Sequence, residues 1–104
     1  MRQKAKVDDN QAEIVDALRA VGASVAVTSA QHKGFPDLVV GYMGKTFLLE
    51  VKDGSKPPSA RRLTSDQERF FADWQGHCAV VCNAEEALAE IGHSPNLASL
   101  QCCG

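Results

Sequence analysis

The sequence predicts an α/β domain: a small mixed β-sheet flanked by helices, with elements in the order α-β-β-β-α-β-α. Three observations lead to this fold class. Helical spacing of apolar residues occurs near the start, in the middle and near the end of the chain. Short apolar runs between residues 24 and 52 are separated by turn residues, and another apolar run follows the middle helix. The 104 residues suffice for a single domain, 1–104, with a modest core.

The first helix is expected from about Gln11 to Val21. Residues 8–10 (Asp-Asp-Asn) offer N-caps before it, and Gly22 ends it. Residues 24–28 then alternate between small polar and apolar side chains, as a half-buried strand does. The apolar stripe of the helix consists of Ile14, Val15, Leu18 and Val21.

A β-hairpin is expected next in the chain. Residues 37–41 form one strand, Met43-Gly44 the turn, and residues 46–52 the returning strand. Because a hairpin brings its two ends together, Asp37 should meet Glu50 at the open end. Side chains alternate along a strand, so Glu50 and Lys52 point to the same face.

Asp37, Glu50 and Lys52 are therefore expected to form one cluster. Two carboxylates about 4 Å apart repel by roughly 4 kcal/mol at an effective dielectric near 20, so a cation must offset them. Lys52 supplies one charge, and Mg²⁺ is commonly held by one or two carboxylates with water and phosphate oxygens. The pattern favours a metal-dependent phosphodiesterase site. The alternative is a surface hairpin with solvated side chains.

The second half of the chain supplies the other helices and the fourth strand. Residues 53–62 carry Gly, Ser, two prolines and several cations, and are expected to be a long loop. Thr64 and Gln67 have the spacing of a capping box that starts the second helix, and Gly76 ends it. A helix joins the third strand to the fourth, residues 77–82, so these two should be parallel, whereas the first three strands should be antiparallel.

Aromatic residues dominate one face of the second helix. Phe70, Phe71 and Trp74 are expected to pack in the core, with a base-stacking platform as the alternative. The last helix begins at residues 83–86 by the same capping logic and ends near 91–92.

Charge and composition limit the function. The net charge is −2, so the chain is not a generally basic nucleic-acid protein, and any DNA contact must come from a local patch. No apolar run is long enough to span a membrane, and residues 1–6 lack the apolar core of a signal peptide. The expected location is the cytoplasm of a bacterium or a phage-infected host. Residues 1–7 and 93–104 are expected to be tails.

The four cysteines match no standard zinc pattern. Cys78 and Cys82 lie in an apolar strand and are expected to be small buried residues. A zinc site is a weaker alternative, and the other residues it could use are His77, His93, Cys102 and Cys103.

With this order of elements, the chain resembles the PD-(D/E)XK nuclease superfamily, and more closely the stand-alone, virus-type VRR-NUC domains. The resemblance covers roughly residues 8–92 and implies a restriction-endonuclease-like core that carries a metal-dependent endonuclease. Its matching residues are Glu13, Gly34-Phe35-Pro36-Asp37, Glu50-Val51-Lys52, and Gln67 with Phe70-Phe71.

The resemblance also implies roles for individual residues. Asp37 and Glu50 would bind Mg²⁺ or Mn²⁺ together with the carbonyl oxygen of Val51, and Lys52 would lie near the nucleophile. Glu13 would reach the metal directly or through water, the alternative being a solvated glutamate on a helix face. In the family, a glutamine at the position of Gln67 reaches toward the Glu-x-Lys strand, which does not conflict with its place in the capping box.

Partners follow from the same resemblance. Stand-alone relatives act as homodimers on branched DNA, and some resolve four-way (Holliday) junctions. A non-cleaving nuclease-fold module that binds DNA or a protein is the alternative. The cations expected to contact DNA phosphates, rather than to be merely solvated, are Lys33, Lys56, Arg61 and Arg62.

Overall fold

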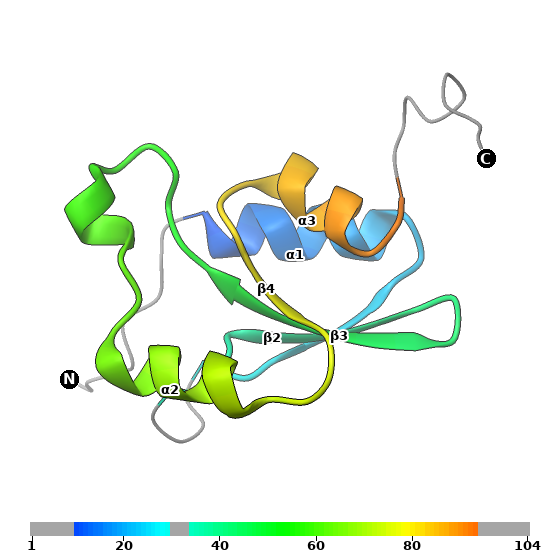
Figure 1. The fold of residues 1–104 in the computed structure, drawn as a ribbon. Coiled ribbons are helices and arrows are strands. Elements are labelled where there is room, and N and C mark those ends of the chain that lie inside the picture. The colour runs from blue at the N-terminus through cyan, green and yellow to red at the C-terminus, as the bar shows by residue number, and fades with distance from the viewer. Residues whose placement is uncertain (1–9, 30–33, 94–104) are drawn as a thin grey trace, which may run out of the picture.

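The computed structural model of the chain describes residues 10–29 and 34–93. A four-stranded sheet with the strand order β1-β2-β3-β4 forms its centre (Figure 1). In chain order, the elements are α1 (Gln11–Ala20), β1 (Ser24–Val27), β2 (Leu38–Tyr42), β3 (Lys45–Val51), the short 3₁₀ helix η1 (Pro58–Arg61), α2 (Ser65–Asp73), β4 (Cys78–Val81) and α3 (Ala84–Glu90). The predicted order of helices and strands is confirmed, with η1 added inside the predicted loop.

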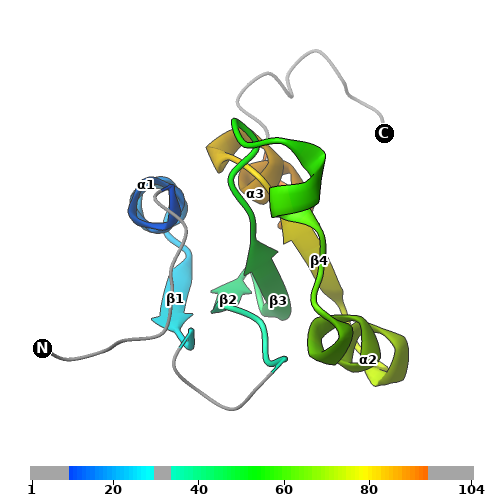
Figure 2. The ribbon, with the colours of Figure 1, turned by 90° about the vertical axis from the view of Figure 1, so that its left-hand side faces the viewer.

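The sheet is mixed, as the sequence predicts. Strands β1, β2 and β3 pair antiparallel, and β4 pairs parallel with β3 after the crossover through α2. Helices α1 and α3 lie together along one face of the sheet, and α2 lies on the opposite side (Figures 1 and 2). One face of the sheet is therefore covered by two helices, whereas α2 lies on the opposite side and buries none of its own residues there.

The turn between β2 and β3 fixes the register of the hairpin. Met43 and Gly44 both have positive φ, 53° and 82°, which is typical of a two-residue type I′ turn. The turn pairs Leu38 with Leu49. The residues just beyond that pair, Asp37 and Glu50, consequently lie side by side at the open end, as expected.

The core lies between the sheet and the α1–α3 layer. Apolar residues of β2 and β3 alternate, so that one set faces these helices and the other faces α2. The predicted stripe of α1 is confirmed, with Val21 packed at its margin. The central core residues are Ile14, Val15, Leu18, Leu38, Val40, Phe47, Leu49, Val51, Val81, Ala87 and Ile91.

Asn10 joins the start of α1 to the ends of two strands. It occupies the N-cap position, but its side chain makes no capping hydrogen bond. Its Nδ2 donates instead to the carbonyl oxygens of Lys52 (3.2 Å) and Cys82 (2.7 Å). The side chain thus ties the first helix to the ends of β3 and β4. The other predicted caps, Asp8 and Asp9, lie outside the described residues.

The aromatic face of α2 corrects one prediction. Phe70, Phe71 and Trp74 were expected in the core, yet α2 has no buried residue and Trp74 is 42% exposed. The reason is that α2 follows an extended loop and touches the sheet mainly through its first turn. Cys78 and Cys82 are half-buried rather than buried, because β4 is the last strand of the sheet.

Within residues 10–29 and 34–93, no helix combines the length and the apolar character needed to cross a membrane.

Candidate active site

Asp37 is fixed at the entry to β2 by contacts on both sides. Thr28, which follows β1, donates its hydroxyl to the carbonyl of Pro36 (2.8 Å) and its N–H to the carbonyl of Asp37 (2.7 Å). Oδ2 of Asp37 accepts the N–H of Val51 (2.9 Å). The carboxylate is therefore held against β3 by a backbone donor, and the partly exposed side chain keeps access to solvent.

Glu50 is the buried member of the pair, with only 2% of its surface exposed. Oε2 accepts a hydrogen bond from Nε2 of Gln67 (2.8 Å) and lies 3.6 Å from Nζ of Lys52. Oε1 is buried and finds no hydrogen-bond partner within residues 10–29 and 34–93. Burial, followed by the negative charge of Asp37, raises the pKa of Glu50 from 4.5 to about 8, although Lys52 acts in the opposite direction.

Gln67 connects α2 to Glu50 of β3 and to Lys52, which follows that strand. Its N–H bonds to Oγ1 of Thr64 (3.1 Å), and its Oε1 accepts the N–H of Thr64 (2.9 Å), which completes the capping box. The same Oε1 accepts from Nζ of Lys52 (3.1 Å), while Nε2 donates to Glu50. The predicted capping box is therefore present, and the same side chain also bridges the Glu-x-Lys pair.

Lys52 is 9% exposed, and its ammonium lies between the side chains of Gln67 and Glu50. Its backbone is fixed as well. The N–H donates to the carbonyl of Val81 (3.0 Å) in β4, and the carbonyl accepts from Asn10. A long, mobile side chain is thereby held in one position beside the two carboxylates.

The donor set fits a divalent cation. Asp37 and Glu50 offer carboxylate oxygens, and one of them, Oε1 of Glu50, is buried with no partner among the residues that the structure describes. In an extended strand, the N–H and C=O of one residue point to the same edge. The carbonyl of Val51 therefore faces the side from which its N–H reaches Asp37. Oxygen ligands of this kind suit Mg²⁺ and Mn²⁺.

No group of three or more His, Cys, Asp or Glu side chains that could hold a metal gathers anywhere in the described ranges. A cation at Asp37 and Glu50 would therefore rely on water and substrate oxygens for its other ligands, as Mg²⁺ often does.

The structure does not bring Glu13 to this cluster. Glu13 is exposed on α1 and lines a separate hollow, together with Asp53 and Arg61 among others. Neither Asp37 nor Glu50 lines that hollow. The expected place of Glu13 beside the metal is thus not seen, because the rotation of α1 turns this side chain away from the sheet.

Gln11 is the polar residue that α1 does bury, and it is not among the site residues predicted from the sequence. It is 7% exposed, and its Oε1 accepts a hydrogen bond from the hydroxyl of Ser29 (3.2 Å). The signal was present, because Gln11 lies three, four and seven residues before the buried stripe residues Ile14, Val15 and Leu18.

The predicted DNA-contacting cations lie on or near η1. Arg62 and Lys56 are exposed, and Nε of Arg61 donates to the carbonyl of Lys56 (2.8 Å). This segment follows directly on β3, beyond the end that carries Lys52 (Figure 1). Lys33 lies outside the described residues.

Comparison of the chain with protein-family models, curated proteins and solved structures gave no match. The resemblance seen in the motifs therefore stays a hypothesis.

Proposed function

We propose that this chain is a metal-dependent DNA endonuclease with a restriction-endonuclease-like core, which hydrolyses phosphodiester bonds with Mg²⁺ or Mn²⁺. One observation carries the proposal: Glu50 is buried beside Asp37, and one of its oxygens has no hydrogen-bond partner in the described part of the chain. A buried polar atom without a partner is costly, and a buried charge costs more unless it is paired or coordinates a metal. A cation between the two carboxylates would remove that cost.

Each residue of the cluster has a distinct role in this proposal. Asp37 and Glu50, with the carbonyl of Val51, would hold the ion. When bound, the ion would acidify a water molecule and stabilise negative charge on the phosphate. Nζ of Lys52 would orient the attacking water or stabilise the charge that develops on the phosphate oxygens. Gln67 positions both Lys52 and Glu50 through its hydrogen bonds.

The cations of the η1 segment support DNA as the substrate. Lys56 and Arg62 are exposed and follow the catalytic strand in the chain, so they could bind phosphates next to the cleaved one. The proposed substrate is branched DNA, such as a four-way junction. A homodimer would place two sites on two strands, which suits symmetric cleavage.

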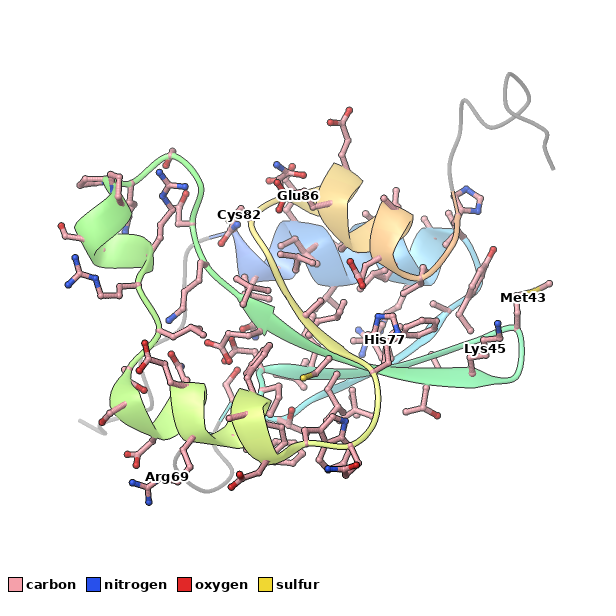
Figure 3. The ribbon with its side chains drawn as sticks, in the orientation of Figure 1. Met43, Lys45, Arg69, His77, Cys82 and Glu86 are labelled. Carbon is pink, nitrogen blue, oxygen red and sulfur yellow. The ribbon has the colours of Figure 1, made fainter. Side chains whose placement is uncertain are left out.

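The test is a cleavage panel with Mn²⁺ on junction, flap, duplex and single-stranded DNA. We expect cuts in the wild type and a loss of roughly a hundredfold or more in rate for Lys52→Ala, the size seen when a charge-stabilising donor is removed. Lys45→Ala is the matched control. Lys45 is an exposed lysine at the tip of the same hairpin, at the opposite end of β3 from the candidate site, and it lies far from Arg69 of α2 (Figure 3).

A second measurement separates cleavage from binding. Calorimetric titration with Mn²⁺ should give a site in the wild type and in Asp16→Ala, whose carboxylate is exposed on α1, and none in Asp37→Ala. DNA that stays intact while Mn²⁺ does not bind would favour the non-cleaving nuclease-fold module instead.

A further inference from the structure

An aromatic hollow lies on the outer side of α2. The rings of Phe70 and Trp74 stack with centroids 5.3 Å apart and planes inclined by 16°. Phe35 packs edge-on against Phe70 at 5.4 Å. The hollow has a volume of about 260 Å³, and Asp66, Arg69 and Asp73 complete its lining. Flat rings thus form a partly open surface with polar groups around it.

The hollow adjoins the candidate active site through two short segments of chain. Phe70 follows Gln67 by three residues on α2, which is roughly 5 Å along the helix axis. Phe35 precedes Asp37 by two residues. The hollow therefore shares α2 with Gln67, which bonds Glu50, and Phe35, which contacts Phe70, lies on the segment that leads to Asp37.

The lining selects for a flat ring with hydrogen-bond donors. Partly exposed aromatic rings bind nucleobases by stacking, which tolerates any base because every base has a π-face. The carboxylates of Asp66 and Asp73 disfavour a phosphate inside the hollow, but such groups accept hydrogen bonds from the amino groups of bases. Arg69 supplies a cation for the phosphate of the same nucleotide.

We propose that this hollow is a stacking subsite for an unpaired nucleobase of the DNA substrate. The proposal rests on the endonuclease function proposed above and narrows its substrate. Bases inside a duplex keep their faces covered by their neighbours, so they cannot enter. The preferred substrate would therefore carry an unpaired nucleotide next to the cleaved phosphodiester, as in a flap, a gap or the open centre of a junction.

Intrinsic fluorescence provides the direct test, because Trp74 is the only tryptophan of the chain. The full-length protein is titrated in EDTA, which prevents metal-dependent cleavage, with a single-stranded oligonucleotide and with an abasic oligonucleotide of the same length. We expect quenching of Trp74 by the first and at least tenfold weaker quenching by the second. Equal responses to the two oligonucleotides would overturn the proposal.

Variants extend the test to affinity, measured by the anisotropy of a labelled oligonucleotide. Trp74→Ala should weaken single-strand binding roughly tenfold, which is typical of one lost base stack, and should leave duplex binding unchanged. Trp74→Phe should retain most of the single-strand affinity, because phenylalanine also offers an aromatic face. Met43→Ala is the control, since Met43 is 81% exposed and apolar but lies at the hairpin tip (Figure 3). Circular dichroism checks that each variant is folded.

Three results distinguish this proposal from the function on which it rests. Selective quenching without cleavage of any DNA in Mn²⁺ would support the subsite and overturn the proposed endonuclease function. Cleavage that Trp74→Ala leaves unchanged on every substrate would remove the subsite alone. Trp74 fluorescence that changes with protein concentration but not with added DNA would also overturn the subsite, because it would indicate that a second copy of the chain covers the hollow.

Discussion

The two faces of the sheet show how differently buried residues can behave in one small domain. Strand β3 and the residue that follows it supply buried side chains to both faces: Leu49 and Val51 face α1 and α3, whereas Glu50 and Lys52 face α2. All four are buried. On the first face, every buried side chain of the strand is apolar. On the second, the buried charged groups are contacted by Gln67 and lie beside Asp37, and one oxygen of Glu50 has no partner in the described ranges.

This difference indicates a division of roles. The face toward α1 and α3 gains free energy from apolar burial. The face toward α2 keeps a carboxylate in surroundings that oppose its charge, as the raised pKa of Glu50 shows. Because side chains alternate along β3, apolar and charged residues follow one another on the same strand. The packing of the apolar side chains therefore also fixes the position of the charged ones.

The largest expected effect is on the apolar face. Leu49→Ala removes a fully buried side chain and should lower the free energy of unfolding by roughly 2–5 kcal/mol. Urea unfolding followed by circular dichroism measures it. Val27→Ala is the control, because Val27 is 51% exposed and should change stability by less than about 0.5 kcal/mol. Similar losses in both variants would contradict the placing of the core on this face.

In metal-free protein, Glu50→Gln is expected to raise the free energy of unfolding, whereas Leu49→Ala lowers it. The folded-state pKa of about 8 exceeds the ordinary value of 4.5, so the folded chain holds the proton more tightly. The stability that this gives is complete below pH 4.5 and is lost as the pH rises through 8. The wild type should therefore weaken across this range, and Glu50→Gln should not share that loss.

Thermal unfolding in EDTA at pH values of about 5 and 9 measures this difference. At the higher pH, Glu50→Gln should melt roughly 5 °C or more above the wild type, as expected for a gain near 1 kcal/mol in a domain of this size. Glu85→Gln, on the exposed side of α3, should behave like the wild type. Added Mn²⁺ should stabilise the wild type and not Glu50→Gln. A wild type that is equally stable at both pH values would show that Glu50 is not strained by burial.

Gln67 tests the link between α2 and the charged pair. Gln67→Ala removes the partner of the Thr64 N–H and both bridges to β3, and should cost about 1–2 kcal/mol. Gln67→Glu keeps the capping box but brings a negative charge to Glu50. Its stability therefore reports the loss of the hydrogen bond to Glu50 without the loss of the cap. Gln75→Ala, exposed beyond α2, is the control. Equal stability of Gln67→Glu and wild type at neutral pH would mean that the bridge to Glu50 has no energetic weight.

The smallest effect is expected at the hairpin tip, which belongs to neither face. Met43 adopts φ 53°, a conformation that asparagine tolerates better in a type I′ turn. Met43→Asn should stabilise the domain by up to about 1 kcal/mol, in line with the cost of unfavourable backbone conformations. Differential scanning calorimetry measures the shift. A loss of stability would show that Met43 makes contacts that its exposure does not suggest.

Features with local signals could be predicted from the sequence. The turn at Met43-Gly44 sets the register and so the meeting of Asp37 with Glu50. The capping box of Thr64 and Gln67 also depends only on spacing. The alternation along β3 then placed Glu50 and Lys52 on one face. In each case, the geometry follows from residues close together in the chain.

Features that depend on packing between distant elements could not be predicted in this way. The rotation of α1 against the sheet buries Gln11 and exposes Glu13, and no local rule sets that rotation. Asn10 reads as a helix cap, but its partners are 42 and 72 residues away. The exposure of Trp74 depends on how little of α2 the sheet reaches.

The candidate site also closes over much shorter stretches of chain than the contact between Asn10 and Cys82 does. Its hydrogen bonds join residues separated by 14, 15 and 17 positions, whereas Asn10 and Cys82 are 72 positions apart. Loop-closure entropy makes the longer closure more costly by about 1.4 kcal/mol when separations of 15 and 72 are compared. During folding, the hairpin and the first turn of α2 can therefore assemble around Glu50 before Asn10 meets Cys82.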